Sequence, residues 1–179
     1  MLKTNAINGL PSIGLNNKVA HLKTAVDFPD SEQNVSVYIV AKQKIGAGSL
    51  SDGNGTFLTT GGNSITIARN YTNGTNTNIT SYFKFVDITA PAVPEDTFLT
   101  ISSIFGPNDQ KLYINEILKE SKTDGIFDAG ADKLHLFTNE LDSNRGNKDI
   151  AEVLIYTSKH DSTERAQVET YLKDKYGHY

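Results

Sequence analysis

The sequence predicts an all-β fold, either a sandwich or a barrel, followed by one short C-terminal helix. About ten short segments rich in β-branched and aromatic residues are separated by Gly, Asn, Asp and Pro, which is typical of sandwiches and barrels and not of alternating strands and helices. The last segment differs, because its apolar residues repeat at helical spacing. A chain of 179 residues is most simply one domain, so we expect a single unit over residues 1–179.

The predicted strands follow one another at short intervals. Residues 35–41 are almost continuously apolar, as in a central strand. Residues 55–60 and 64–68 flank a Gly-Gly-Asn turn and predict a hairpin. Residues 81–86 alternate, which places two phenylalanines on one face of a strand. The remaining strands are predicted at 97–105, 111–115, 134–137 and 149–156, with a turn at 106–109.

The terminal helix is predicted over residues 162–176. Asp161 can cap its first turn, and Glu164 three residues later completes a capping box. Gly177 supplies the residue that ends the helix. One apolar stripe at helical spacing comprises Val168, Tyr171, Leu172 and Tyr176. We therefore expect the helix to lie against the β-structure through this stripe.

Glu152 lies in the middle of the strand predicted at 149–156, among apolar residues. A carboxylate buried there needs a partner, and Arg165 on the terminal helix is the obvious candidate. We expect a structural ion pair between Glu152 and Arg165 that fastens the helix to the sheet.

The C-terminal segments carry a resemblance to a known family. Residues 149–156 (DIAEVLIY), 161–165 (DSTER) and 168–177 (VETYLKDKYG) resemble the C-terminal end of bacterial and phage laminin-G-like domains of the concanavalin A-like lectin/glucanase superfamily. Residues 111–115 (KLYIN) are similar to a strand and turn of these domains, although Glu116 stands where glycine is usual. The resemblance implies a two-sheet antiparallel β-sandwich of the jelly-roll type with one short C-terminal α-helix.

Catalysis is not expected, although some relatives on this sandwich are glucanases. Such enzymes need two carboxylates about 5–5.5 Å apart for retention, which on a strand means a Glu-x-Asp-x-Glu pattern. Glu116 and Glu120 lack the central acid. The Tyr-Phe-Lys run at 82–84 matches one strand of a polysaccharide lyase, but its companion strands are missing. No Gly-x-Ser-x-Gly elbow accompanies the four histidines. We predict a protein that is not an enzyme.

A metal site is predicted in a glycine-rich loop. Asp124, Asp128 and Asp132 are spaced by four, with Gly125 and Gly130 between them. Carboxylates in such a loop can wrap a hard cation, and the resemblance implies calcium at the rim of the domain. The alternative is that Asp and Gly are turn residues. Calcium is the one cofactor that the sequence suggests.

A carbohydrate site is predicted in a polar segment rich in Asn and Thr. Its candidate residues are Asn70, Tyr71, Asn73 and Asn76. A tyrosine ring can stack on a sugar while amide side chains bind its hydroxyl groups. The alternative is a solvated loop, and the absence of Trp weakens the case, because Trp is the best stacking platform.

Composition limits the partners. The formal net charge is −4, no block of like charges stands out, and Cys is absent. We therefore expect neither nucleic acid nor an anionic membrane surface as a partner, and neither disulfides nor thiolate zinc sites. No apolar run approaches the ~18 residues of a membrane span, and the N-terminus lacks the apolar region of a signal peptide.

These observations favour a non-enzymatic binding or structural module of a bacteriophage particle, in its tail fibre, baseplate or capsid surface. The expected location is the virion, and the expected partners are a host surface glycan or other virion proteins. A homo-oligomer is expected, because multivalency offsets weak single-site binding. The alternative is a carbohydrate-binding or adhesion domain of a larger bacterial surface protein or polysaccharide-degrading enzyme, located outside the cell.

Overall fold

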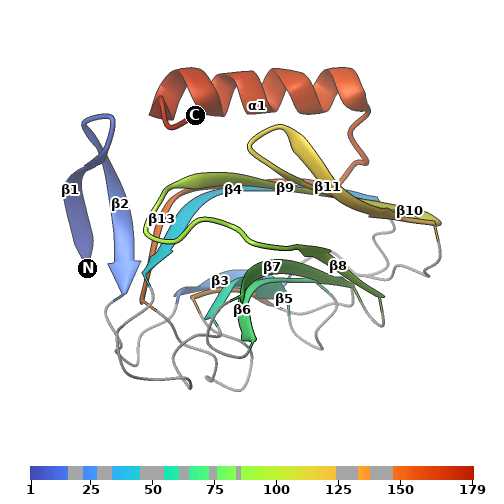
Figure 1. Ribbon diagram of the computed structural model, residues 1–179, viewed down its shortest axis with the longest axis horizontal. Helices are drawn as coiled ribbons and strands as arrows, with labels where there is room; N and C mark the ends of the chain where they lie inside the picture. The colour runs from blue at the N-terminus through green and yellow to red at the C-terminus, as the bar shows by residue number, and fades with distance from the viewer. Residues whose placement is uncertain are drawn as a thin grey trace.

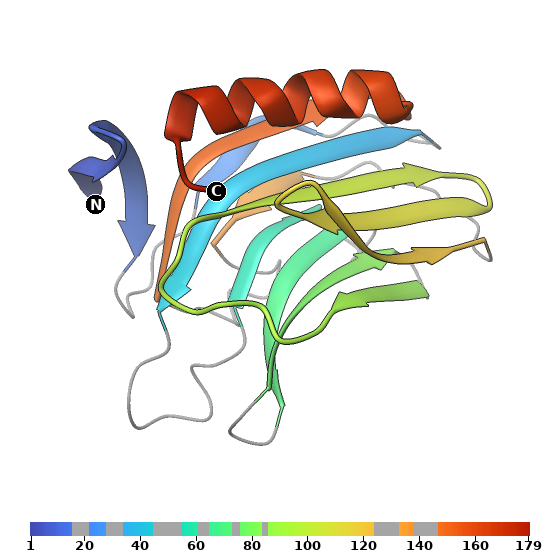
Figure 2. The same cartoon turned by 45° about the horizontal axis from the view of Figure 1, so that its top comes forward.

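The computed structural model describes residues 1–15, 22–27, 34–44, 55–60, 65–72, 76–83, 86–123, 133–137 and 147–179. In these residues two antiparallel β-sheets face each other, and one C-terminal helix, α1 (Ser162–Tyr176), lies across the outer face of one sheet (Figures 1 and 2). The predicted β-sandwich with a terminal helix is therefore confirmed. No helix in this part of the chain is long and apolar enough to span a membrane.

We call the sheet beneath α1 the helix-covered sheet. Its strands, in spatial order, are β1 (Leu2–Ile7), β2 (Leu10–Leu15), β13 (Asn147–Tyr156), β4 (Val35–Lys44), β9 (Leu99–Gly106), β10 (Asp109–Ile114) and β11 (Ile117–Lys122). The second sheet contains β3 (Leu22–Asp27), β12 (Lys133–Leu136), β5 (Gly55–Thr60), β6 (Ile65–Thr72), β7 (Asn76–Phe83) and β8 (Val86–Ala90). The last strand in sequence, β13, lies between β2 and β4. Because α1 follows β13 in the chain, the helix begins near the centre of the helix-covered sheet.

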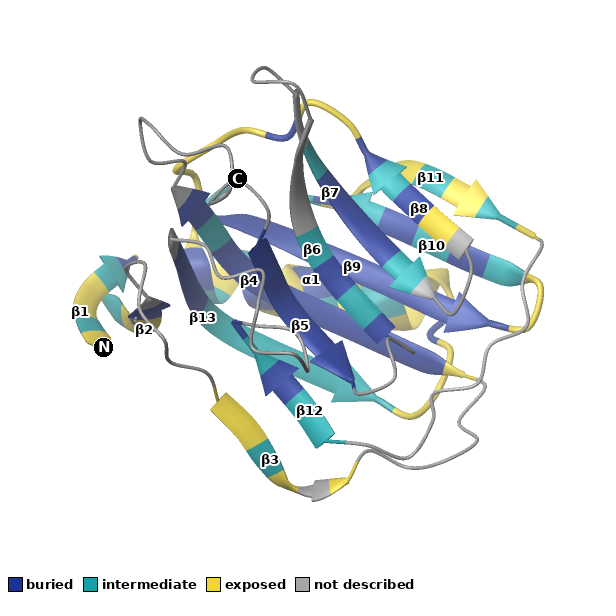
Figure 3. Ribbon diagram, turned by 90° about the horizontal axis from the view of Figure 1, so that it is seen from below, coloured by how far each residue is buried: buried dark blue, intermediate teal, exposed yellow. Residues whose placement is uncertain are grey.

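β4 is buried on both faces, which explains its almost continuous apolar sequence. Val37 and Ile39 belong to the core between the two sheets. Tyr38 and Val40 point the other way, into a second core under α1 that includes Leu172. Figure 3 shows the buried residues concentrated in the central strands and the exposed residues along the edge strands β1, β3 and β11. Fully burying one such side chain contributes about 1.5–3 kcal/mol.

The ends of α1 follow local sequence rules. Asp161 Oδ1 accepts the backbone N–H groups of Thr163 (2.7 Å) and Glu164 (2.9 Å), while Glu164 Oε2 accepts the Asp161 N–H at 2.9 Å. Gly177 adopts φ +57° and ends the helix. The predicted bounds and capping box are confirmed. Within the predicted apolar stripe, however, Tyr171 is 47% exposed, and a carboxylate, Glu169, is buried in the face that meets the sheet.

Glu152 pairs with Lys175, and the predicted partner, Arg165, is wrong. Lys175 Nζ lies 3.0 Å from Glu152 Oε1, and the Tyr171 hydroxyl donates to the same oxygen at 3.1 Å. Arg165 instead pairs with Glu169 on its own helix. Because α1 runs back over β13, Glu152 in the middle of the strand faces the last turn of the helix. Lys175 in that turn lies about 15 Å along the helix from Arg165, at 1.5 Å per residue.

One hairpin was not predicted, and one predicted strand proved to be two paired strands. β1 and β2 join at Asn8-Gly9, where both residues have positive φ. Asn-Gly is the preferred pair for such a two-residue turn, so this signal was available in the sequence. The strand predicted at 81–86 is wrong, because β7 ends at Phe83 and β8 begins at Val86, the two being paired. Alternation alone does not distinguish one strand from two paired strands.

Candidate functional site

Three of the four residues predicted to bind carbohydrate lie in the paired strands β6 and β7. The structure describes the backbone of Asn70, Tyr71 and Asn76, and it extends both strands into the segment that was expected to be a loop, with Tyr71 paired to Thr77. Asn73 lies outside the described residues. The carbohydrate site at this hairpin stays a prediction.

The predicted calcium ligands Asp124, Asp128 and Asp132 all lie outside the described residues. Within the described ranges, no three His, Asp or Glu side chains lie close enough together to hold a metal ion. Calcium therefore stays a prediction that concerns the 124–132 segment alone.

A polar pocket of about 300 Å³ opens where the β9–β10 turn faces the first residues of α1. We call it the helix-start pocket. Its lining comprises Ile104, Asp109, Lys111, Tyr113, Lys159, His160, Asp161, Ser162 and Arg165. These residues come from three segments: β9 and β10 of the helix-covered sheet, the connection between β13 and α1, and the first turn of the helix.

The β9–β10 turn supplies a carboxylate that two lysines share. Lys111 Nζ lies 3.0 Å from Asp109 Oδ1, and Lys159 Nζ lies 2.5 Å from Asp109 Oδ2. Partial burial acts to raise the pKa of Asp109, but hydrogen bonds from Lys159 and Lys111 outweigh it and leave the pKa lowered. Asn108 in the turn has φ +56°, a conformation that Asn tolerates well.

Gly106 makes room for one of these lysines. A Cβ atom at this position would come within 2.6 Å of Lys159 Cδ, closer than real side-chain contacts allow. The absence of a side chain on Gly106 therefore lets the aliphatic part of Lys159 pass over the end of β9 and reach Asp109.

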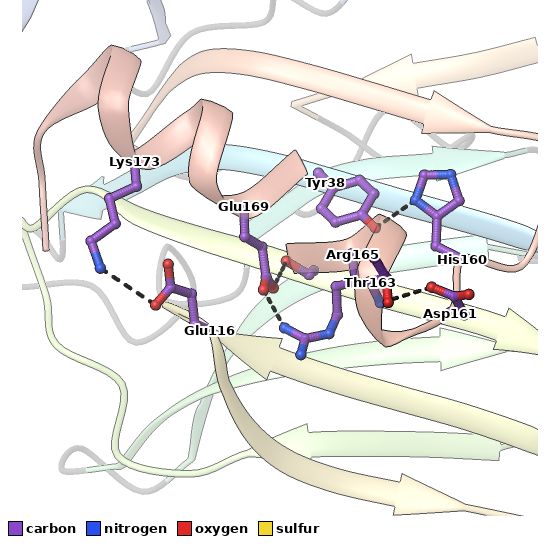
Figure 4. Close-up of polar contacts among 9 residues, drawn as sticks. Tyr38, Glu116, His160, Asp161, Thr163, Arg165, Glu169 and Lys173 are labelled. Atoms are coloured by element: carbon purple, nitrogen blue, oxygen red, sulfur yellow. Dashed lines mark hydrogen bonds and ion pairs between the residues drawn. The ribbon is translucent and has the colours of Figure 1, made fainter. Parts of the chain in front are cut away.

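Hydrogen bonds from side chains of β4 hold the connection between β13 and α1 in place. The Ser36 hydroxyl donates to the Ser158 carbonyl at 2.8 Å and accepts the His160 N–H at 2.9 Å. The Tyr38 hydroxyl shares a 2.8 Å hydrogen bond with His160 Nδ1 (Figure 4). The His160 ring also lies 4.3 Å from the ring of Tyr156, centroid to centroid. Buried hydrogen bonds of this kind fix the orientation of the imidazole.

Arg165 forms one wall of the pocket in a fixed position. Its guanidinium pairs with Glu169 and stacks 4.0 Å from the ring centroid of Tyr113. Glu169 also accepts a 2.8 Å hydrogen bond from the Ser102 hydroxyl. Burial raises the pKa of Glu169, although the Ser102 and Arg165 contacts oppose this shift. Because an ion pair and a stacking contact both hold the Arg165 guanidinium, its side chain is preorganised.

A second hollow, of about 350 Å³, lies between the β1–β2 hairpin and β13. Its walls are mostly apolar, including Leu2, Pro11 and Ile13, and its one ionisable lining residue, Glu152, is already paired with Lys175. The helix-start pocket offers more groups for a polar ligand, and we take it as the candidate site.

Sequence reasoning did not predict this pocket. Its lysines, Asp109 and His160 belong to no motif, and their spacing along the chain carries no signal. The 106–109 turn and the start of the helix were both predicted correctly, but nothing local in the sequence indicates that they meet.

No protein-family model matches the sequence, and no curated protein matches it in sequence. Among solved structures, the fold is similar to a heptameric SAP-like pentraxin from Limulus polyphemus, with a TM-score of 0.66, 10% identity, and coverage of 87% of this chain and 77% of that chain. It is also similar to the binding domain of botulinum neurotoxin serotype G, with a TM-score of 0.67, 13% identity, and coverage of 97% and 46%.

A third similar structure is the serotype D binding domain of the same toxin group, with a TM-score of 0.63, 14% identity, and coverage of 95% of this chain and 45% of that chain. This chain thus spans less than half the length of these toxin structures. At such identities the likeness shows the fold alone, which is a β-sandwich of two antiparallel sheets.

Proposed function

We propose that this protein is a non-enzymatic binding module that recognises a glycan-bearing surface. The observation that carries the proposal is the helix-start pocket, in which charged and hydrogen-bonding side chains line a hollow of about 300 Å³. Ligand sites in proteins combine a concave surface with a few well-placed polar groups. The tightly held His160 and Arg165 give this pocket the fixed geometry that selective binding needs.

The fold neighbours support the ligand class by analogy. Several are binding domains of botulinum neurotoxins, one of them in complex with rat synaptotagmin II. A further fold neighbour is botulinum neurotoxin type C, whose cell entry is dependent upon interaction with two ganglioside molecules. These properties belong to the toxins, and fold-level analogy alone does not transfer a function. Together with a polar pocket, they favour recognition of a glycan.

The more specific proposal is a bacteriophage virion protein of the laminin-G-like type, in a tail fibre, baseplate or capsid surface. Its support is the amino-acid sequence of residues 149–177, which resembles that of bacterial and phage members of the group. In such a particle, many copies would offset weak binding at each site. The similarity to less than half of each toxin chain favours a second candidate, a domain of a larger bacterial surface protein or polysaccharide-degrading enzyme.

The test is a glycan array with the purified chain, run with calcium and again with a chelator. Selective binding lost on chelation supports the proposal and directs attention to Asp124, Asp128 and Asp132. Binding that is independent of calcium supports it through the helix-start pocket or the 70–76 hairpin. A blank array under both conditions contradicts glycan recognition. Neighbouring tail genes, as opposed to a multidomain reading frame, would separate the phage proposal from its alternative.

A further inference from the structure

We propose that the helix-start pocket binds the carboxylate or sulfate group of an acidic saccharide, through the ammonium groups of Lys111 and Lys159. This inference rests on the proposed binding function and specifies the class of its ligand.

One cluster in the pocket has a charge opposite in sign to that of the whole protein. The ammonium groups of Lys111 and Lys159 share the single carboxylate of Asp109, which leaves one positive charge. Arg165 is balanced by Glu169, and the Asp161 carboxylate accepts N–H groups at the start of α1. The chain as a whole has a formal net charge of −4. A local excess of positive charge on an acidic protein attracts an anion to this place and not to the rest of the surface.

The carboxylates of the pocket already have partners. Asp161 Oδ1 accepts two backbone N–H groups of α1, and both oxygens of Asp109 lie within 3.1 Å of a lysine ammonium. Each ammonium group carries three N–H bonds. The contacts to Asp109 use at most two of them on Lys111 and one on Lys159. Each lysine therefore keeps a donor for a ligand, so the complementary ligand is one that brings acceptor oxygens.

The two lysines are both preorganised and accessible. Asp109 brings their ammonium groups to a single carboxylate, and Gly106 leaves space for the Lys159 stem. The Lys111 and Lys159 side chains remain 37% and 34% exposed, so a ligand can reach them from solvent. Holding two donors in place before binding lowers the entropy cost of fixing an anion between them.

The size and walls of the pocket favour a small sugar with polar contacts. A volume of about 300 Å³ is at the low end of the range for small-molecule sites and suits one sugar ring. The Tyr113 ring has one face covered by the Arg165 guanidinium, so charged hydrogen bonds dominate over aromatic stacking. Ser162 and His160 complete a lining of groups that can bind hydroxyls.

The experiment is an NMR titration of the ¹⁵N-labelled full chain. The probes are sodium glucuronate and glucose 6-sulfate, and the controls are glucose and sodium sulfate. The expected result is saturable movement of the amide signals of Asn108, Asp109, His160 and Ser162 with both acidic sugars, and little movement with glucose. Equal affinity for sodium sulfate and glucose 6-sulfate would overturn the saccharide claim, because the pocket would then hold a simple anion.

Single-residue variants test whether the acidic sugar binds at Lys111 and Lys159. Lys111→Gln and Lys159→Gln should each weaken the acidic sugars about 5- to 10-fold, because each removes one charge-assisted contact at a partly exposed site. Gly106→Ala should also weaken them, since its Cβ would displace Lys159. Lys23→Gln is the matched control, because it makes the same charge change on the exposed strand β3 of the second sheet. If Lys23→Gln weakens binding as much as Lys111→Gln, the assignment is wrong.

The two proposals fail in different ways. Neutral glycans that bind on the array, with NMR shifts outside the helix-start pocket, would overturn this inference and leave the binding function standing. A blank array together with no response to either acidic sugar would overturn both.

Discussion

Arg165→Met should destabilise the protein strongly, because it leaves a buried carboxylate without its cation. The Glu169 side chain is 1% exposed, and in the described part of the chain it is held by Arg165 and by the Ser102 hydroxyl at 2.8 Å. Breaking a buried ion pair by removing one partner typically costs about 3–5 kcal/mol. In a chain of this size each kcal/mol corresponds to about 2–4 °C in Tm, so we expect a fall of at least about 6 °C.

A second substitution should restore most of the loss. In Arg165→Met/Glu169→Gln the buried charge is gone, while the glutamine carbonyl can still accept the Ser102 hydroxyl. The double variant should lie within about 1–2 kcal/mol of the parent protein, since replacing a buried pair by neutral groups is often close to neutral in stability. The remaining deficit is the lost stacking of Arg165 on Tyr113.

The cost of Arg165→Met should also depend on pH. Burial already raises the pKa of Glu169 above its ordinary value of 4.5, and removing Arg165 takes away an opposing influence, so the pKa rises further. A carboxyl group whose pKa is raised by folding binds more protons in the folded state than in the unfolded state. The free energy of unfolding therefore falls as pH rises from the ordinary pKa of 4.5 through the folded-state pKa. The single variant should be closest to the parent at pH 5 and furthest from it at pH 8.

The assay is urea unfolding followed by circular dichroism at pH 5 and pH 8, with the parent, the single and the double variant measured side by side. The double variant should show no extra pH dependence, because it lacks the Glu169 carboxyl. The reasoning is refuted if Arg165→Met costs less than about 1 kcal/mol at pH 8, or if the double variant is less stable than the single one.

Three further predictions concern single positions. Glu152→Ala removes the contact with Lys175 and should lower the Tm by about 2–4 °C, with sugar binding unchanged; an unaltered Tm would contradict the role of this pair. Glu116→Gly should raise stability by up to about 1 kcal/mol in thermal unfolding, since Glu116 has φ +67° and glycine adopts that conformation without strain; a loss of stability would show that its exposed contact with the helix outweighs the strain. Burial lowers the pKa of His178 to about 4, so the unfolded state, with an ordinary pKa near 6.5, binds more protons between these values. Stability should therefore fall as pH drops from 6.5 towards 4, and His178→Gln should flatten this part of the unfolding profile; an unchanged profile would refute it.

Much of the fold could be predicted because its signals are local. The capping box of Asp161 and Glu164 and the ending at Gly177 involve residues within one helical turn of each other, so sequence spacing reports them directly. β4 was likewise predicted from composition alone, since a strand buried on both faces must be apolar throughout.

The ion pair of the helix shows where such reasoning ends. Glu152 was expected to need a partner on α1, and it has one, but the partner is Lys175 and not Arg165. The choice depends on the direction in which the helix crosses β13 and on where along the strand it lies. Neither is encoded in the spacing of a few neighbouring residues.

The sequence by itself therefore determined the secondary structure of the best-marked segments: the central strand, the 106–109 turn and the capped terminal helix. The tertiary structure alone decided the candidate site. Tyr38 and His160 are separated by 122 positions in the chain, and they meet because the order of strands places β13 beside β4. The physical reason is that caps, turns and periodicity act between near neighbours, whereas a pocket is assembled by contacts whose partners are chosen only when the sheets form.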